Sequence, residues 1–206
     1  MAEAARRLGA RVRVQVGDLV EERTREELVQ AVATLGGVDL LVNNASELGG
    51  LSPIAAVPVE RLERLWRINV VAPLALVRVM LLLLALRRGA IVNVSSDAAQ
   101  GAYAGWGAYG ATKAALELIG RTMAVELQDR GVTVINVDPG DMRTRMHQEA
   151  FPGEDISDRP LPDVTRPFWE WLLDQLDQAA QAGRAASISG MRFQAQTEDE
   201  RWAVRV

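Results

Sequence analysis

Four short runs rich in valine, isoleucine and leucine, and a weaker fifth run, recur along the chain and constrain its fold more than any other feature. They are predicted as strands at 11–16, 38–43, 89–96, 132–137 and 186–190. Helical segments are predicted between them at about 21–35, 59–86, 109–129 and 163–182. Strands that are apolar on both faces need cover on both faces. The alternation therefore predicts an α/β fold with a parallel sheet and right-handed helical crossovers.

The composition is that of an ordinary globular protein. The 206 residues are 49% hydrophobic and 24% charged, which is typical of one domain spanning 1–206. A net charge of −4 provides no basic surface for a phosphate backbone, so nucleic acid is not an expected partner. The absence of cysteine excludes disulfides and thiolate chemistry and fits a reducing compartment. The first ten residues hold no apolar run of the signal-peptide kind, so we expect a cytoplasmic protein.

One apolar segment, 70–86, raises the question of a membrane helix. It is shorter than the roughly 20 residues that a spanning helix needs, and it contains Pro73 and Arg78. A helix that is apolar nearly all round can instead be covered by a sheet on one side and by a second subunit on the other. We therefore expect a buried or subunit-contacting helix and no membrane partner.

Small and polar residues follow four of the predicted strands, at the rim where parallel sheets bind ligands. They are Gly17, Asp18 and Leu19, then Asn43, Asn44, Ala45 and Ser46, then Ser95 and Ser96, and finally Asp138, Pro139 and Gly140. All five asparagines lie in or beside these strands or the long helix, and none lies in a surface turn. For a single asparagine, a hydrogen bond that closes a turn is the usual reason for its presence. Their shared placement favours a ligand site.

Lys113 is the only lysine in a chain that otherwise uses arginine for positive charge. Unlike arginine, lysine is a compact point charge whose pKa responds to its surroundings. Tyr109 precedes Lys113 by four residues at the start of a predicted helix, so the two side chains share a face. An adjacent ammonium lowers the pKa of a tyrosine, which makes the pair a candidate acid–base site. The alternative for this common spacing is an exposed helical pair.

Further residues surround this pair in a recognisable order. Ser96 ends the run IVNVSS thirteen residues before Tyr109, and Asn69 and the segments LVNNAS and PGDMRT accompany it. From about residue 5 to 194, the chain resembles the short-chain dehydrogenase/reductase family. The resemblance implies a Rossmann-like, doubly wound parallel sheet. It also implies an oxidoreductase that transfers a hydride between a nicotinamide dinucleotide, NADP or NAD, and a small-molecule alcohol or carbonyl substrate, with no metal.

The resemblance implies a catalytic or substrate-binding role for each matched residue. Tyr109 would exchange a proton with the substrate oxygen, and Ser96 would hold that oxygen. Lys113 would lower the pKa of Tyr109 and donate to the nicotinamide ribose. Asn69 would interrupt the long helix and hold a water of the proton relay. Trp106, between Ser96 and Tyr109, would be either a wall of the substrate pocket or a packing residue.

The cofactor-binding residues implied by the resemblance form three groups. Asp18 and Leu19 would flank the adenine. The centre of the sheet would support the cofactor through Asn43, Asn44 and Ala45. The nicotinamide side would be lined by Pro139, Gly140, Met142 and Thr144, together with Tyr109 and Lys113.

The sequence departs from the family pattern in two places. Ser46 stands where the family's Asn-Asn-Ala-Gly motif ends in glycine, a change that we expect the site to tolerate. The glycine-rich turn that cradles the pyrophosphate, and the first two strands with it, would precede Met1 and have no counterpart here. The predicted Rossmann-like sheet is thus N-terminally truncated, and the preference between NAD and NADP is unreadable. Either the protein begins upstream of this sequence, or it is a shortened homologue that keeps the catalytic half.

The truncation has a consequence for strand pairing. Without the two missing strands, a gap would separate 11–16 from 38–43, and unpaired buried backbone groups cost about 1–3 kcal/mol each. We therefore expect these two runs to pair directly. The family also joins subunits through the helices that correspond to 70–86 and 109–127, so a homodimer or homotetramer is expected. The competing function is a non-catalytic homologue that dimerises or binds without taking a dinucleotide.

Two remaining features receive simpler interpretations. His147 is predicted to be a solvated residue within an irregular flap at 145–163, and no second ligand near it suggests a metal. The aromatic residues Phe168, Trp169 and Trp171 are predicted to form core or a subunit contact rather than a ligand cage.

Overall fold

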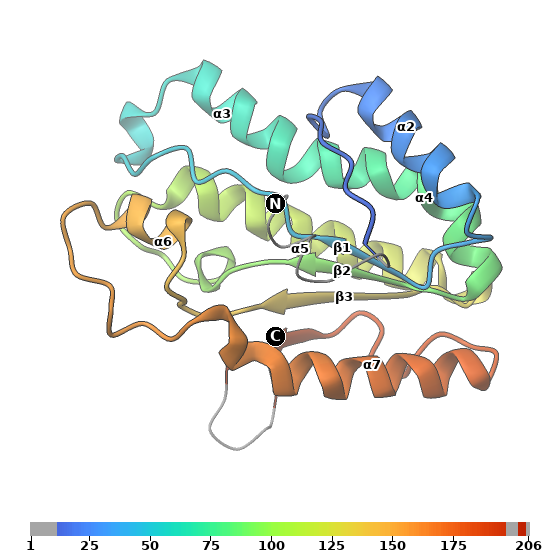
Figure 1. The fold of residues 1–206 in the computed structure, drawn as a ribbon. Coiled ribbons are helices and arrows are strands. Elements are labelled where there is room, and N and C mark those ends of the chain that lie inside the picture. The colour runs from blue at the N-terminus through green and yellow to red at the C-terminus, as the bar shows by residue number, and fades with distance from the viewer. Residues whose placement is uncertain (1–11, 197–201, 205–206) are drawn as a thin grey trace.

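The computed structural model describes residues 12–196 and 202–204, which form one sheet with helices on both faces (Figure 1). Its five strands follow the order β1-β2-β3-β4-β5. Their bounds are β1 Leu40–Asn43, β2 Ala90–Val94, β3 Thr133–Asp138, β4 Arg192–Gln194 and β5 Ala203–Val204. The first four are parallel, and β5 is antiparallel to β4. The prediction of an α/β fold with a covered parallel sheet is confirmed.

The helices form two layers (Figure 1). One face of the sheet carries α2 (Glu22–Ala33), α3 (Val59–Trp66), η3 (Arg67–Val71), α4 (Ala72–Arg87) and α5 (Gly107–Glu126), and the other face carries α7 (Arg166–Gln181). The remaining short elements are α6 (Arg145–Ala150), η2 (Ile54–Ala56), η4 (Asp97–Ala99), η5 (Gln128–Arg130) and η6 (Pro162–Thr165). Because both faces are covered, each central strand is apolar on both sides.

Two apolar cores result, one on each face of the sheet. On one side, Ile91 and Val134 pack with Leu84 of α4, and all three side chains are fully buried. On the other side, Phe168 of α7 is also fully buried, with the rings of Trp169 and Trp171 at 5.5 and 5.9 Å from its own. The aromatic residues of α7 therefore belong to the core, which was one of the two predicted alternatives.

The long apolar helix lies against the sheet rather than apart from it (Figure 1). Its helical turns continue from Val59 to Arg87 as α3, the π-helical turn η3 and α4, and by length and composition alone it could cross a membrane. In its most apolar window, 44% of the residues are buried inside the protein. Core helices of soluble proteins share these properties, so the feature by itself is weak support for a membrane span.

Two strand predictions are wrong. The described part of the first run, 12–16, forms no strand and no backbone hydrogen bond with 38–43, and Val16 is 75% exposed. This run alternates valine with Arg13 and Gln15, so it has only one apolar face, whereas this sheet is covered on two. The run 186–190 forms turns, and the strand comes later, at β4, because Gly190 adopts a φ of +86° that breaks an extended chain.

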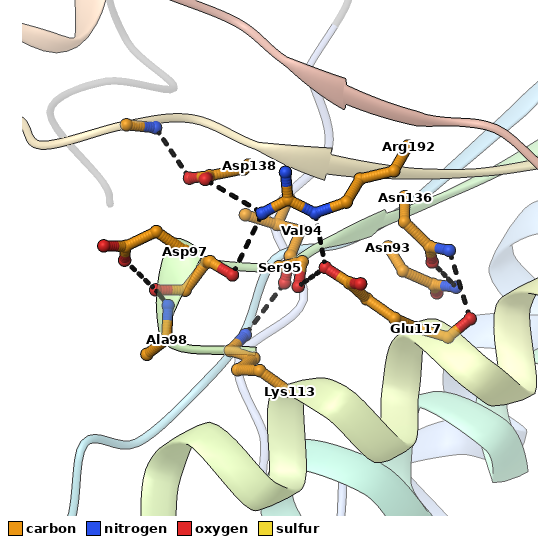
Figure 2. Close-up of polar contacts among 12 residues, drawn as sticks. Asn93, Val94, Ser95, Asp97, Ala98, Lys113, Glu117, Asn136, Asp138 and Arg192 are labelled. Atoms are coloured by element: carbon orange, nitrogen blue, oxygen red, sulfur yellow. Dashed lines mark hydrogen bonds and ion pairs between the residues drawn. The ribbon is translucent and has the colours of Figure 1, made fainter. Parts of the chain in front are cut away.

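A row of asparagine side chains crosses the sheet inside the protein. Asn43, Asn93 and Asn136 lie in register on β1, β2 and β3. The Asn43 amide donates to Asn93 at 2.9 Å, Asn93 donates to Asn136 at 3.1 Å, and Asn136 donates to the Glu117 carbonyl of α5 at 3.1 Å; the last two bonds are drawn in Figure 2. Three of the five asparagines thus pair with one another, so their shared placement reflects sheet structure as well as a ligand rim.

Gly120 of α5 lies directly against this row, and its replacement provides a test. A Cβ atom at Gly120 would lie 2.5 Å from Oδ1 of Asn136 and 2.7 Å from Nδ2 of Asn93. We predict that Gly120→Ala lowers the free energy of unfolding by about 1–3 kcal/mol, although alanine favours helices. Chemical denaturation followed by circular dichroism measures the change, with Leu118→Ala as the control because Leu118 is 58% exposed on the same helix. A stabilised Gly120→Ala protein would contradict the close packing.

Candidate active site

A cleft of about 390 Å³ opens at the carboxyl ends of β1, β2 and β3. Ten residues that the sequence indicated line it: Asn44, Ala45, Ser96, Trp106, Tyr109, Lys113, Pro139, Gly140, Met142 and Thr144. They come from the loops that follow three parallel strands and from one face of α5. The position agrees with the general rule that open parallel sheets bind ligands beyond the carboxyl ends of their strands.

Four predicted site residues lie away from the cleft lining. Asp18 accepts a hydrogen bond from the Val20 backbone at 2.9 Å and closes a turn before α2. Leu19 packs at the margin of the apolar core beneath α4. The amide of Asn43 is bonded to Asn93. Asn69 is buried behind the cleft, where its side chain makes structural hydrogen bonds.

Asn69 joins three segments through all of its polar atoms. It lies in η3, a single π-helical turn within the long helix, at the place where the resemblance implied an interruption. Its Oδ1 accepts from the Ser46 hydroxyl at 3.1 Å and from the Glu47 backbone at 2.9 Å. Its Nδ2 donates to the Glu47 carbonyl at 2.9 Å and to Thr112 at 3.0 Å. Asn69 therefore fixes the loop after β1 to α5, and Ser46 uses its extra hydroxyl in that connection.

Tyr109 lies in the first turn of α5 and is 6% exposed. Burial raises the pKa of Tyr109 to about 12, while the hydroxyls of Ser46 and Ser96 act in the lowering direction. The Lys113 ammonium lies 5.6 Å from the centre of the Tyr109 ring. The sequence predicted a lowered pKa for this tyrosine, and that prediction is wrong for the net effect, because desolvation of the phenolate outweighs the groups that stabilise it.

Lys113 is buried one helical turn further along α5, with 2% of its surface exposed. Its ammonium donates to the Val94 carbonyl of β2 at 2.8 Å. Burial lowers the pKa of Lys113 from 10.5 to about 8, and the nearby Glu117 carboxylate limits the fall. Val94 is the one acceptor of this ammonium in the described structure, so two of its three hydrogens remain for a ligand. The alternative of an exposed helical pair is excluded.

Ser96 combines a capping contact with a place on the cleft wall. Its hydroxyl accepts from the Ala98 backbone at 3.2 Å and donates to the Asp97 carboxylate at 3.0 Å. The serine side chain is thereby held at the start of η4, beside the end of β2. Trp106 lies edge-on to Tyr109 at 6.0 Å, so it both packs and lines the cleft.

A buried charged network lies beneath the cleft, and sequence reasoning missed it (Figure 2). The Arg192 guanidinium of β4 donates to Glu117 at 2.9 Å, to Asp138 at 3.0 Å and to the Ser96 carbonyl at 3.2 Å. Ser95 donates to the same Glu117 oxygen at 2.5 Å. Burial raises the pKa of Asp138, against the lowering effect of the Gly140 backbone and Arg192. The available sequence signals were an arginine within a strand-like run and a glutamate one turn after Lys113.

His147 does not occupy the predicted solvated loop. It lies in α6, which Thr144 caps by accepting from the His147 backbone at 3.2 Å, so part of the predicted irregular flap is helical. The His147 side chain is 9% exposed, lines the cleft and packs on Phe151 with ring centres 4.9 Å apart. Its Nδ1 lies 3.7 Å from the Asp141 carboxylate. The prediction failed because Thr144, Phe151 and the cleft wall hold this segment in place.

The donor set fits the nicotinamide ribose half of a dinucleotide. Lys113 offers two free hydrogens, Tyr109 offers a hydroxyl at the same wall, and the adjoining loop carries Gly140 with φ of +73° close to Gln196. A volume of about 390 Å³ is near the lower end for small-molecule pockets. Within 12–196 and 202–204, no glycine-rich turn leads from a strand into a helix in the way that binds pyrophosphate.

The depressed pKa of Lys113 makes the stability of the protein depend on pH. Between about pH 8 and 10.5, the unfolded chain holds a proton on this lysine that the folded protein has released. We predict that the wild type gains about 2–3 kcal/mol relative to Lys113→Met as the pH rises through this interval. Urea unfolding of both proteins at pH 7 to 10.5 measures the difference. Tyr109 contributes to the pH dependence of both proteins, so its contribution cancels to first order in their difference. If the free energies of unfolding of the two proteins changed with pH in parallel, that result would contradict a buried, titrating Lys113.

The sequence of the chain is similar to those of known oxidoreductases. The family model described as short chain dehydrogenase matches residues 1–155. An uncharacterized oxidoreductase of Escherichia coli, YciK, is 32% identical over 173 residues, covering 80% of this chain and 68% of the relative. A diacetyl reductase [(S)-acetoin forming] of Staphylococcus epidermidis is 35% identical over 132 residues, covering 63% of this chain and 51% of its own. The chain spans about half the length of several curated relatives.

Solved structures show the same fold. The crystal structure of YciK superposes with a TM-score of 0.78 at 30% identity, covering 89% of this chain and 73% of that one. A short chain dehydrogenase of Shigella flexneri, solved in complex with NADP, gives a TM-score of 0.77 at 30% identity and covers 89% of this chain and 74% of that one. The sheet and the sequence match agree, and the chain belongs to the short-chain dehydrogenase/reductase family of oxidoreductases.

Proposed function

We propose that this chain carries the catalytic site of a nicotinamide-dependent oxidoreductase acting on a small-molecule alcohol or carbonyl. The observation that supports this most directly is the arrangement of Ser96, Tyr109 and Lys113 around one cleft, with the two helical residues buried. A bound dinucleotide would supply or accept the hydride. The protein's part is to hold the substrate oxygen, to exchange its proton and to orient the ribose.

Tyr109 would serve as the proton donor to the substrate oxygen in carbonyl reduction. With a pKa of about 12, its phenol is fully protonated at neutral pH and can act as the acid. The reverse reaction requires the phenolate, which the Lys113 ammonium would stabilise below the lysine pKa of about 8. Ser96 would turn its hydroxyl from Asp97 to the substrate oxygen. Lys113 would use its two free hydrogens for the ribose hydroxyls.

Asn69 would contribute to the site indirectly, by holding neighbouring segments in place. Its four hydrogen bonds hold the loop after β1 against α5, and this contact sets the distance between that loop and Tyr109. Holding a relay water, as the resemblance implies, would require one of these bonds to open. The loops with Asn44, Ala45, Pro139, Gly140, Met142 and Thr144 would enclose the nicotinamide, and Trp106 would form the substrate wall.

We propose NADP or NAD as the cofactor. Two solved relatives support a nicotinamide dinucleotide, one in complex with NADP and one with NADPH. The competing proposal, a homologue that binds no dinucleotide, makes a different prediction for a direct titration. Adding NADPH or NADH to the 206-residue chain should enhance the nicotinamide fluorescence if the cleft takes the ribose half, and no enhancement with either would favour the competitor.

The lack of cysteine and of a basic surface supports a cytoplasmic protein without nucleic-acid partners.

Replacing Tyr109 tests the acid–base assignment. Tyr109→Phe keeps the ring and its packing on Trp106 but removes the proton donor. We predict that turnover falls by about 10²–10⁴-fold or more, while the dinucleotide affinity changes little. Steady-state kinetics with a small carbonyl substrate, and a fluorescence titration with NADPH, measure the two quantities. Tyr103→Phe is the matched control, since Tyr103 is 49% exposed and outside the cleft lining. Near-normal turnover of Tyr109→Phe would refute the assignment.

We also propose that the protein assembles through α4 and α5 as a homodimer or homotetramer. Large apolar side chains on these helices are exposed, among them Leu82 at 75%, Leu86 at 73% and Val125 at 76%. Exposed apolar surface of this kind marks interaction sites. We predict that sedimentation at micromolar concentration shows a dimer or tetramer and that Leu82→Glu dissociates it. Leu173→Glu on α7, at a position 51% exposed, is the control and should leave the assembly intact.

A further inference from the structure

Lys113 and Glu117 are spaced as an ordinary helical ion pair, yet they do not form one. Oppositely charged residues four apart on a helix lie on the same face and commonly pair. Here the Lys113 ammonium donates to the Val94 carbonyl at 2.8 Å, and no ion pair joins it to Glu117 in the part of the chain that the structure describes. The Glu117 carboxylate instead faces Ser95 and Arg192 (Figure 2). Something holds these two opposite charges apart within a buried site.

Arg192 is the group that forms an ion pair with Glu117. Its Nε donates to Oε1 of Glu117 at 2.9 Å, and the two side chains are only 5% and 7% exposed. Its Nη2 donates to Asp138 at 3.0 Å and to the Ser96 carbonyl at 3.2 Å, so the planar guanidinium cannot rotate without losing three contacts. Arg192 lies 75 residues after Glu117 and is brought beside it by the pairing of β4 with β3.

We propose that Arg192 is a positioning residue, which holds the Glu117 carboxylate away from Lys113 and so keeps the Lys113 ammonium at Val94 and the cleft. If Arg192 lost its charge, Glu117 would remain buried and anionic with Lys113 one turn away on the same helix. A lysine side chain is long and flexible, so its ammonium would move to the unpaired carboxylate. That movement would take the ammonium from the ribose position, a consequence that rests on the proposed function.

The other charged groups around Lys113 would not take the place of Glu117 as the partner of the ammonium. Asp138 of β3 is already bonded to the Gly140 backbone as well as to Arg192, and Asp97 of η4 accepts from Ser96. Tyr109 is protonated at neutral pH. Across the cleft, Asp141 lies 3.7 Å from His147. Glu117 is therefore the carboxylate that would lose its cationic partner without Arg192 and that lies close enough to pair with Lys113.

The chain has a single lysine, so the inference can be tested by direct titration. In protein labelled with carbon-13 lysine, one ε-carbon NMR signal reports the charge of Lys113, with no dinucleotide or substrate present. The wild type should titrate with a midpoint of about 8. In Arg192→Met, which keeps length without charge, we expect the midpoint to rise by about one pH unit or more, because a free carboxylate within about 4–6 Å stabilises the ammonium.

Two double variants separate positioning from a general loss of structure. Adding Glu117→Gln to Arg192→Met removes the competing carboxylate, so the midpoint should return to the wild-type value or below it. Adding Asp138→Asn to Arg192→Met removes the other carboxylate that Arg192 contacts but leaves Glu117 free, so the midpoint should stay high. An unchanged midpoint in Arg192→Met, or equal rescue by the two second substitutions, would overturn the proposal.

A gentler variant covers the case in which Arg192→Met does not fold. Arg192→Gln keeps a neutral donor near Glu117, so the midpoint of the Lys113 titration should rise by a smaller amount, and adding Glu117→Gln should again cancel the rise. An unchanged midpoint in a folded Arg192→Gln protein would also overturn the proposal. Circular dichroism establishes folding for each variant. Because the titration requires no hydride transfer, an inactive protein with the expected midpoints would refute the proposed function alone. Active protein with unshifted midpoints would refute only the role of Arg192.

Discussion

Lys113, Glu117, Asp138 and Arg192 lie inside the protein at the carboxyl ends of β2 and β3, where an unpaired charge would cost several kcal/mol. Two positive and two negative groups are brought together from α5, β3 and β4, and Ser95 and the Ser96 carbonyl satisfy further donors and acceptors. The floor of the cleft is therefore polar and charged without being open to water. On the cleft wall, this arrangement holds the Ser95 side chain and the Ser96 backbone in place.

The same requirement explains the asparagine row across the sheet. Burial leaves Asn43, Asn93 and Asn136 no water to bond, so each amide is paired with the next, and the last reaches the helix backbone at Glu117. The row and the charged network meet at α5. That helix therefore carries Tyr109 and Lys113 on its first turns and is anchored to the sheet further along, which links the strand register to the geometry of these two residues.

Burial shifts the pKa values of the two central residues in opposite directions. It raises the pKa of Tyr109 to about 12 and lowers that of Lys113 to about 8, because each shift favours the neutral form. A protonated phenol beside a cation that can still lose its proton fits the proposed delivery of a proton to a carbonyl oxygen. The network beneath then has a second task, since it determines whether the lysine charge faces the cleft or a neighbouring carboxylate.

The local pattern of the sequence was sufficient for most of the sheet. The runs 38–43, 89–96 and 132–137 were predicted within a few residues of β1, β2 and β3, because an apolar run bounded by helices is a local signal. The run 11–16 was predicted as a strand although its alternating Val14 and Gln15 give it only one apolar face, which does not suit the sheet with two covered faces that the same sequence predicted; in the structure its described part, 12–16, forms no strand. The spacing of Tyr109 and Lys113 likewise indicated the site, since one helix sets their positions, and the family resemblance added Ser96 at a strand end.

The tertiary structure alone decided how the site is charged and what supports it. Arg192 is 75 residues from Glu117, and nothing local at either position indicates the partner. The burial of His147 follows from the packing of α6 on the cleft wall, and the net pKa shift of Tyr109 follows from its desolvation. By itself, the sequence determined which groups lie at the carboxyl ends of the strands. Their pairing and their charge depended on how strands and helices distant in the chain exclude water around them, which is a property of the folded protein.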